Sequence, residues 1–194
     1  GFTGEATIPQ TADKNWNNLA GQMVTASDAN DQIDAYGTAI SEPRLNTQQL
    51  NLFGDGEYGR TPDSASLNVT TAATWEVWGD IGVSFSKYNT VGNQRSFGLR
   101  TSGNLYISND GINTDAAILP AVSRSLLTIT FNAGVVDFYF DGAYHSSDTL
   151  STTSIYNGTA DLLIGAGYGA GGATDFADKK IGSVKIYNVA LTAA

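Results

Sequence analysis

Apolar and polar residues alternate along most of the chain after Leu45. In the clearest stretch, Leu127, Ile129 and Phe131 fall on one side of the alternation and polar residues fall largely on the other. The stretch 135–140 alternates in the same way and ends at Asp141-Gly142, a pair typical of two-residue hairpin turns. A period of two predicts half-buried β-strands, so 126–140 is expected to form a hairpin with a further strand behind it.

Other stretches show the same character and are bounded by Gly, Asn, Asp or Ser. They predict strands over Gln48–Phe53, Thr74–Val77, Gly82–Tyr88, Ser96–Arg100, Asn104–Ser108, Asp161–Ile164 and Lys180–Tyr187. No window carries a convincing helical stripe. About nine or more short strands at this spacing predict an all-β protein, folded as a two-sheet antiparallel sandwich or jelly roll.

Residues 1–44 differ in composition and pattern: they are mostly polar and show no regular alternation of apolar and polar residues. They are interpreted as a mostly irregular N-terminal arm or wrapping segment, followed by the jelly-roll domain at 45–194. Trp16 is the expected anchor of the arm, because a large aromatic side chain in a polar segment often packs into a groove. Two alternatives stay open: an edge strand and loops of the same domain, or a short helical turn within 25–36.

Three short motifs follow one another between Leu50 and Trp78, namely FGDGEY at 53–58, TPDSASL at 61–67 and WEVW at 75–78. Near the other end, VVDFYFDG at 135–142 and IGSVKIYNVAL at 181–191 also occur in order. Together they resemble laminin-G-like domains, which belong to the concanavalin A-like lectin and glucanase jelly rolls and are related to pentraxins. The resemblance covers about residues 45–194 and implies a concanavalin A-like antiparallel sandwich.

The segment 84–111 contains the residues NQRS at 93–96. It resembles laminin-G-like domains found in bacteriophage virion proteins. This resemblance implies an origin on the surface of a particle.

The chain holds 10 Lys and Arg against 19 Asp and Glu, for a formal net charge of −9. This balance argues against nucleic-acid partners, because phosphate binding requires clustered cations. The chain has no cysteine and one histidine, which excludes disulfides, thiol catalysis and a cluster of histidine ligands. No apolar stretch approaches the ~20 residues that span a bilayer, so no membrane insertion is expected.

Catalytic patterns are weak. Glucanase relatives carry acids at alternate positions of one strand, whereas here Glu76 and Asp80 flank Trp78 and would lie about 13 Å apart, too far for glycoside hydrolysis. The single histidine, His145, follows the hairpin turn and is expected to be exposed. The run Gly167–Gly172 matches G-x-G-x-x-G, but no helix follows it, so it is interpreted as a rim loop. The chain is therefore predicted not to be an enzyme.

Binding in this architecture uses rim loops and aromatic side chains. The predicted ligand-binding residues are Tyr88, Asn89, Asn93, Gln94, Tyr168 and Asp175.

Calcium is the one cofactor for which the sequence offers candidate ligands. The resemblance implies that the Asp-Asn pair of pentraxin calcium sites is replaced here by Asn93 and Gln94, which are both neutral. A different calcium site would use Asp55, Glu57 or Asp110, whose alternative role is to cap turns.

These observations predict a non-enzymatic module on a virion surface, as a capsid decoration, fibre or tail-associated protein that mediates attachment. Its expected partners are capsid or appendage proteins and host glycans, with homo-oligomerisation as a further expectation. The alternative is a carbohydrate-binding or adhesin module of a larger secreted, extracellular protein.

Overall fold

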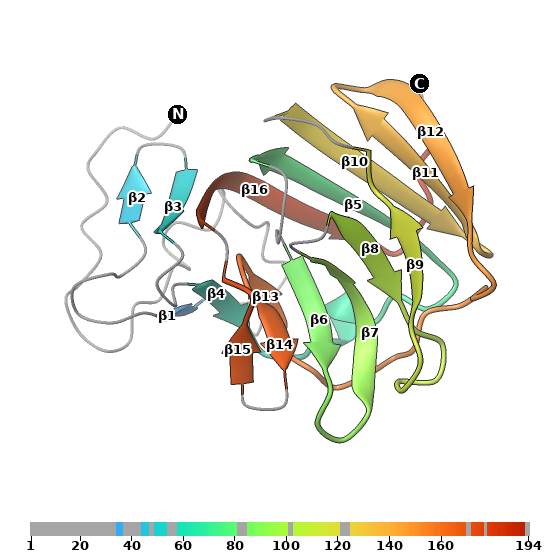
Figure 1. The fold of residues 1–194 in the computed structure, drawn as a ribbon, viewed down its shortest axis with the longest axis horizontal. Helices are drawn as coiled ribbons and strands as arrows, with labels where there is room; N and C mark the ends of the chain where they lie inside the picture. The colour runs from blue at the N-terminus through green and yellow to red at the C-terminus, as the bar shows by residue number, and fades with distance from the viewer. Residues whose placement is uncertain are drawn as a thin grey trace.

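The structure is a computed structural model. It describes the backbone of residues 34–36, 44–46 and 49–53, together with residues 58–80, 85–100, 103–120, 125–169, 172–176 and 178–192. The strands pair into two seven-stranded sheets and one small two-stranded sheet (Figure 1). Every recorded strand pair is antiparallel. The predicted all-β antiparallel sandwich is therefore confirmed.

The first large sheet is called sheet I. Its strands in spatial order are β1 (Asp34–Tyr36), β4 (Tyr58–Thr61), β13 (Leu162–Ile164), β6 (Phe85–Asn89), β7 (Gln94–Leu99), β8 (Asn104–Ile107) and β9 (Asp115–Ile118).

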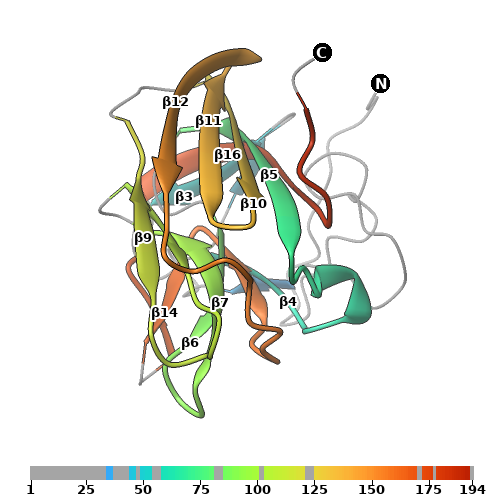
Figure 2. The ribbon, with the colours of Figure 1, turned by 90° about the vertical axis from the view of Figure 1, so that its right-hand side faces the viewer.

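The second large sheet is called sheet II. Its strands in spatial order are β12 (Ala143–Thr149), β11 (Val135–Phe140), β10 (Ser125–Asn132), β5 (Ala72–Gly79), β16 (Asp178–Tyr187), β3 (Gln49–Phe53) and β2 (Arg44–Asn46). The two sheets form two layers (Figure 2).

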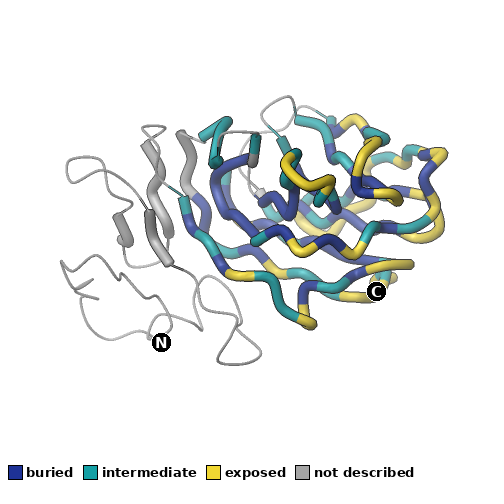
Figure 3. Tube along the Cα trace, turned by 90° about the horizontal axis from the view of Figure 1, so that it is seen from below, coloured by how far each residue is buried: buried dark blue, intermediate teal, exposed yellow. Residues whose placement is uncertain are grey.

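The hydrophobic core fills the space between the two sheets. Trp75 of β5 stacks on Phe85 of β6, with ring centroids 6.0 Å apart, and contacts Phe97 of β7 at 5.3 Å. All three rings are fully buried. Buried residues run through the interior of the described part, and exposed residues gather at turns and edges (Figure 3). The aromatic trio therefore joins the middle of sheet I to the middle of sheet II.

The predicted hairpin forms as expected. β10 pairs with β11, and Leu127, Ile129 and Phe131 are fully buried. Asp141 and Gly142 have φ angles of 51° and 82°, the left-handed pair that a tight hairpin turn of this twist requires, and β12 follows.

Several short elements were not predicted from the sequence. β4 and β9 have four residues each, too few for alternation to be distinctive. The run at 167–172, interpreted as a rim loop, instead begins a small hairpin of β14 (Gly167–Gly169) and β15 (Gly172–Thr174). A short 3-10 turn, η2, covers Ala65–Leu67. Among the described residues no helix is long and apolar enough to cross a membrane.

The predicted arm contains one edge strand and the first residue of another. Residues 34–36 are extended rather than helical, and they pair with β4 at one edge of sheet I. β2, which straddles the predicted boundary at residue 44, pairs with β3 at one edge of sheet II. These pairs agree with the alternative in which this region adds edge strands to the sandwich. Trp16 lies outside the described residues, and the arm boundary stays a prediction.

The two tryptophans of β5 provide a matched test of the core. Trp75 is fully buried, whereas Trp78 is 45% exposed on the outer face of sheet II. Trp75→Ala is expected to lower the free energy of unfolding by about 3–5 kcal/mol, because it removes buried contacts and leaves a cavity. Trp78→Ala is expected to cost much less. Urea denaturation of both variants measures the difference, and equal losses would contradict this assignment of the core.

Candidate functional site

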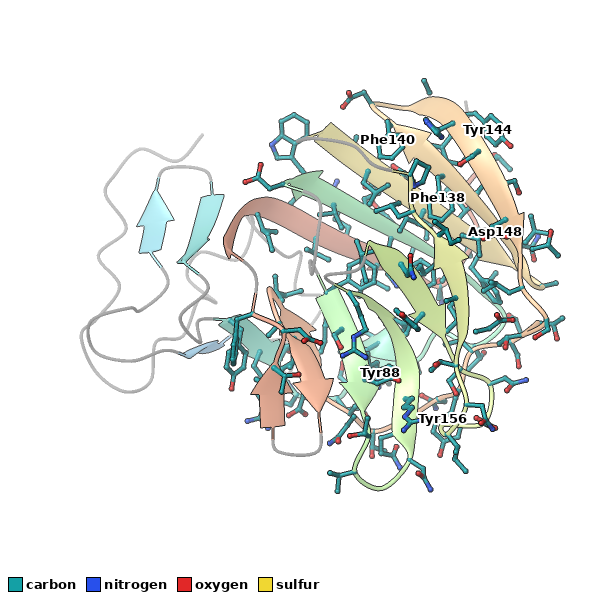
Figure 4. The ribbon with its side chains drawn as sticks, in the orientation of Figure 1. Tyr88, Phe138, Phe140, Tyr144, Asp148 and Tyr156 are labelled. Carbon is teal, nitrogen blue, oxygen red and sulfur yellow. The ribbon has the colours of Figure 1, made fainter. Side chains whose placement is uncertain are left out.

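A bulge in the β6–β7 pair decides which side chains face outward. Lys87 pairs with Phe97, but the next pair is Tyr88 with Arg95, so Ser96 has no partner of its own. Residues directly opposite each other share a face of the sheet. Because Phe97 points into the core, Tyr88 and Arg95 share the outer face of sheet I, and the Arg95 guanidinium lies 5.8 Å from the Tyr88 ring centroid. Figure 4 shows Tyr88 at these two strands.

Arg100 extends this arrangement across three strands. Its guanidinium lies 5.5 Å from the ring centroid of Tyr88 on β6 and 5.8 Å from that of Tyr106 on β8. On the intervening strand, Gly98 pairs with Ser86 on one side and Tyr106 on the other, and it has no side chain to separate the two rings. We call Tyr88, Arg95, Arg100, Tyr106 and Asp175 the tyrosine–arginine cluster.

Asp175 completes the cluster from a distant part of the sequence. Its Oδ2 accepts a hydrogen bond from Nη2 of Arg100 at 2.5 Å. Burial lowers the pKa of Arg100, but the hydrogen bond and the charge of Asp175 outweigh it and hold that pKa above its usual value. The side chains of Arg100 and Asp175 are about one-third exposed, at 31% and 34%, so solvent reaches this ion pair.

The cluster includes two of the predicted ligand-binding residues, Tyr88 and Asp175, and Arg100 connects them. Tyr88 is only 6% exposed, so it supports the two guanidinium groups more than it offers its own ring to a ligand. Arg95, Arg100 and Tyr106 are each partly exposed. These three residues were missed by sequence reasoning.

The three predicted amide residues lie at the turn between β6 and β7: Asn89 ends β6, Asn93 is in the turn, and Gln94 begins β7. Asn89 Oδ1 accepts the backbone N–H of Val91, and Asn93 is exposed with a left-handed φ of 58°. Gln94 points to another segment, where its Oε1 accepts the backbone N–H of Thr159 at 2.7 Å. Asn89 and Gln94 therefore already have partners within the protein, and Asn93 is the most available of the three.

The inward side of the same strands is fixed by a buried lysine. Lys87 is 1% exposed, and its Nζ donates to Oδ1 of Asp63 at 2.6 Å and to the carbonyl oxygen of Gly158. Ser96 Oγ accepts the backbone N–H of Gly158 at 3.2 Å. These contacts tie the segment after β12 to the end of β6 and β7, which gives the cluster a rigid base.

Tyr168 belongs to β14 by its backbone, and its side chain lies outside the described residues. β14 lies against β6, and a Cβ added at Gly167 would lie 3.2 Å from Oδ2 of Asp175. The β14–β15 hairpin is therefore adjacent to the cluster, and ligand contact by Tyr168 stays a prediction.

The calcium candidates are not brought together in the part that the structure describes. Asp55 and Glu57 lie outside the described residues. Asp110 caps its own turn: Oδ1 accepts the backbone N–H groups of Ile112 and Asn113 at 2.8 Å each, and Oδ2 accepts Nδ2 of Asn113 at 2.7 Å. No group of three or more His, Cys, Asp or Glu residues that would hold a metal occurs among the described residues. Calcium binding stays a prediction.

Two candidates for catalysis, Glu76 and His145, contact other side chains of the protein. Glu76 Oε2 accepts a hydrogen bond from the Tyr187 hydroxyl at 3.1 Å and lies 3.4 Å from Nζ of Lys185. His145 is exposed on β12, as expected, with its ring edge-on to Phe140.

Comparison with known proteins now identifies the family. A family model described as the concanavalin A-like lectin/glucanases superfamily matches residues 53–194. The chain belongs to this superfamily. The resemblance to concanavalin A-like jelly rolls is thereby confirmed. A comparison with curated proteins finds no match.

Solved structures of this superfamily architecture are similar in fold at low identity. The carbohydrate-binding module CBM40 of a Ruminococcus gnavus sialidase, bound to α2,3-sialyllactose, is 12% identical with a TM-score of 0.54, over 77% of this chain and 94% of that one. The receptor-binding domain of a botulinum neurotoxin mosaic serotype C/D is 13% identical with a TM-score of 0.56, over 83% and 43%. A Trypanosoma rangeli sialidase variant is 12% identical with a TM-score of 0.52, over 97% and 32%.

This chain thus spans less than half the length of the botulinum toxin structures it matches. It spans nearly the whole of the sialidase carbohydrate-binding module. At these identities the likeness establishes the fold.

The turn at Asp110 gives a pH-dependent prediction. The hydrogen bonds from Ile112 and Asn113 hold the pKa of Asp110 well below its usual range. Because the folded pKa is below the unfolded value of about 3.9, the carboxylate stabilises the fold above that pH and loses this contribution as the pH falls further. Asp110→Asn is expected to lower the melting temperature at pH 7, and its difference from the wild type is expected to shrink as the pH falls from about 4 to 2. Parallel melting curves across that range would contradict this role.

Proposed function

We propose that the chain is a non-enzymatic carbohydrate-binding module and that its ligand binds at the tyrosine–arginine cluster. The observation that supports this most is the arrangement of Arg100 between Tyr88 and Tyr106, with Asp175 beside it, on the outer face of sheet I. Sugars are bound by aromatic rings that contact their C–H faces and by a few well-placed polar groups that bond their hydroxyls. The cluster supplies both.

The side chains divide this work between them. Partly exposed Tyr106 offers an aromatic surface, and Arg95 and Arg100 offer guanidinium donors. The partly exposed Asp175 carboxylate offers an acceptor, although one of its oxygens already bonds Arg100. Donors and an acceptor close to one ring suit the alternating hydroxyls of a sugar.

The comparisons support the same ligand class. The R. gnavus module is described as bound to sialyllactose, and a structure of botulinum neurotoxin type C, 10% identical with a TM-score of 0.55, is described by its dependence on two ganglioside molecules. Both ligands carry sugars. A binding role also agrees with Glu76, which bonds Tyr187 and Lys185 on the outer face of sheet II rather than facing a second acid.

The second candidate function is attachment on a virion surface. A secreted adhesin is the alternative setting for the same module. The virion role is supported by the resemblance of residues 84–111 to phage laminin-G-like domains. Those residues form β6, β7 and β8, the strands that carry most of the cluster. The two candidates are compatible, because a particle that binds host glycans would use such a module at its surface.

A matched pair of tyrosines tests the proposed site. Tyr106→Ala is expected to weaken glycan binding about tenfold, because it removes one aromatic contact and one support of Arg100. Tyr144→Ala, at a 60% exposed tyrosine on β12 of the other sheet, is expected to bind as the wild type does. A glycan array followed by calorimetry on the best ligand measures both. Loss in Tyr144→Ala alone would move the site to sheet II, and no glycan binding by the wild type would overturn the function.

Removal of residues 1–44 tests attachment. If this segment docks the module on a particle, the truncated chain is expected to lose assembly or capsid binding while it keeps glycan binding. Light scattering and co-sedimentation with particles measure this. An untruncated chain that is strictly monomeric and binds no particle would contradict the virion role and leave the secreted adhesin.

A further inference from the structure

Arg95 differs from the other cationic side chains that the structure describes. Arg60 pairs with Asp161, Lys87 with Asp63, Arg100 with Asp175 and Lys185 with Glu76. Arg95 has no acidic partner among the described residues. In a chain with 19 acidic residues against 10 basic ones, a cation without an acidic neighbour is unexpected.

The contacts of Arg95 hold its guanidinium in place but do not give its side chain a hydrogen-bond partner within the described part of the chain. The guanidinium lies over the Tyr88 ring, and the backbone N–H of Arg95 donates to the carbonyl oxygen of Gly111 at 3.3 Å, which fixes the strand beneath it. The Nε atom is buried and has no hydrogen-bond partner in the structure. A guanidinium held by a cation–π contact uses none of its N–H groups in that contact, so they stay available to a further partner.

We propose that Arg95 binds a carboxylate of the ligand, so the glycan is one that contains an acidic sugar. This inference rests on the proposed function and narrows it to a ligand class. A guanidinium edge matches a carboxylate with two parallel hydrogen bonds, and such charge-assisted bonds are about twice as strong as neutral ones. A neutral sugar would leave the charge of Arg95 without a counterion inside the complex.

The charges around Tyr88 support an anionic group at Arg95 and neutral hydroxyls at Arg100. Asp175 already balances the charge of Arg100, so the two arginines and one aspartate leave a local charge of one positive unit. That excess lies on a protein with a net charge of −9, which repels free anions at a distance. At direct contact, the local positive charge outweighs this long-range repulsion and is able to hold one carboxylate.

The experiment compares ligands that differ only in the carboxylate. Wild-type protein is titrated by calorimetry with oligogalacturonate and its methyl ester, and with 3′-sialyllactose and its methyl ester, so that uronic and sialic acids are tested separately. The acidic member of at least one pair is expected to bind about 10- to 100-fold more tightly than its neutral partner. Equal affinity within both pairs would overturn the acidic ligand and leave glycan binding intact, whereas no binding to any glycan would count against the proposed function itself.

Variants then assign the preference to Arg95. Arg95→Gln is expected to remove the difference within the preferred pair, and Arg95→Lys to restore part of it, because an ammonium keeps the charge but loses the two-pronged geometry. Lys185→Gln removes one positive charge from the outer face of sheet II and is expected to keep the full preference. Thermal melts confirm that each variant is folded. An unchanged preference in Arg95→Gln, or an equal loss in Lys185→Gln, would overturn the assignment.

Discussion

The packing of Trp75 against Phe85 and Phe97 is the interaction on which the arrangement of this protein depends. Three large rings from three strands meet where the two sheets face each other, and all are fully buried. In a strand, fixing one side chain inward fixes its neighbours outward. The direction of every polar group on β6 and the far half of β7 therefore follows from the packing of this trio.

The tyrosine–arginine cluster forms where that alternation is broken once. Ser96 is the extra residue of the β7 bulge, so Phe97 stays in the core while Arg95 turns to the outer face beside Tyr88. Bulges of this kind re-aim side chains next to functional sites. The buried contacts of Lys87 and Ser96 with Gly158 hold the strands beneath this point. The core and the cluster thus share the same strands but use opposite faces.

The strands with strong alternation were predictable from the sequence, and so was the Asp141-Gly142 hairpin, because both depend on local pattern and turn chemistry. Short strands such as β4 and β9 were not, since their pairing comes from neighbours far along the chain. For the site, the aromatic Tyr88 and the loop acid Asp175 were identified as candidates. Arg95 was missed because regular alternation from Phe97 would point it inward, and Arg100 because its partner Asp175 is 75 residues away.

The β7 bulge has a consequence for how this module changes during evolution. A single-codon deletion of Arg95 that keeps Ser96 as the extra residue would bring Gln94 opposite Tyr88 on the outer face, with the Trp75 trio left as it is. An amide would then occupy the outward position that a guanidinium holds now. Ligand preference in such a scaffold is therefore adjustable by short insertions and deletions as well as by point substitutions, at a position where the fold already accommodates an extra residue.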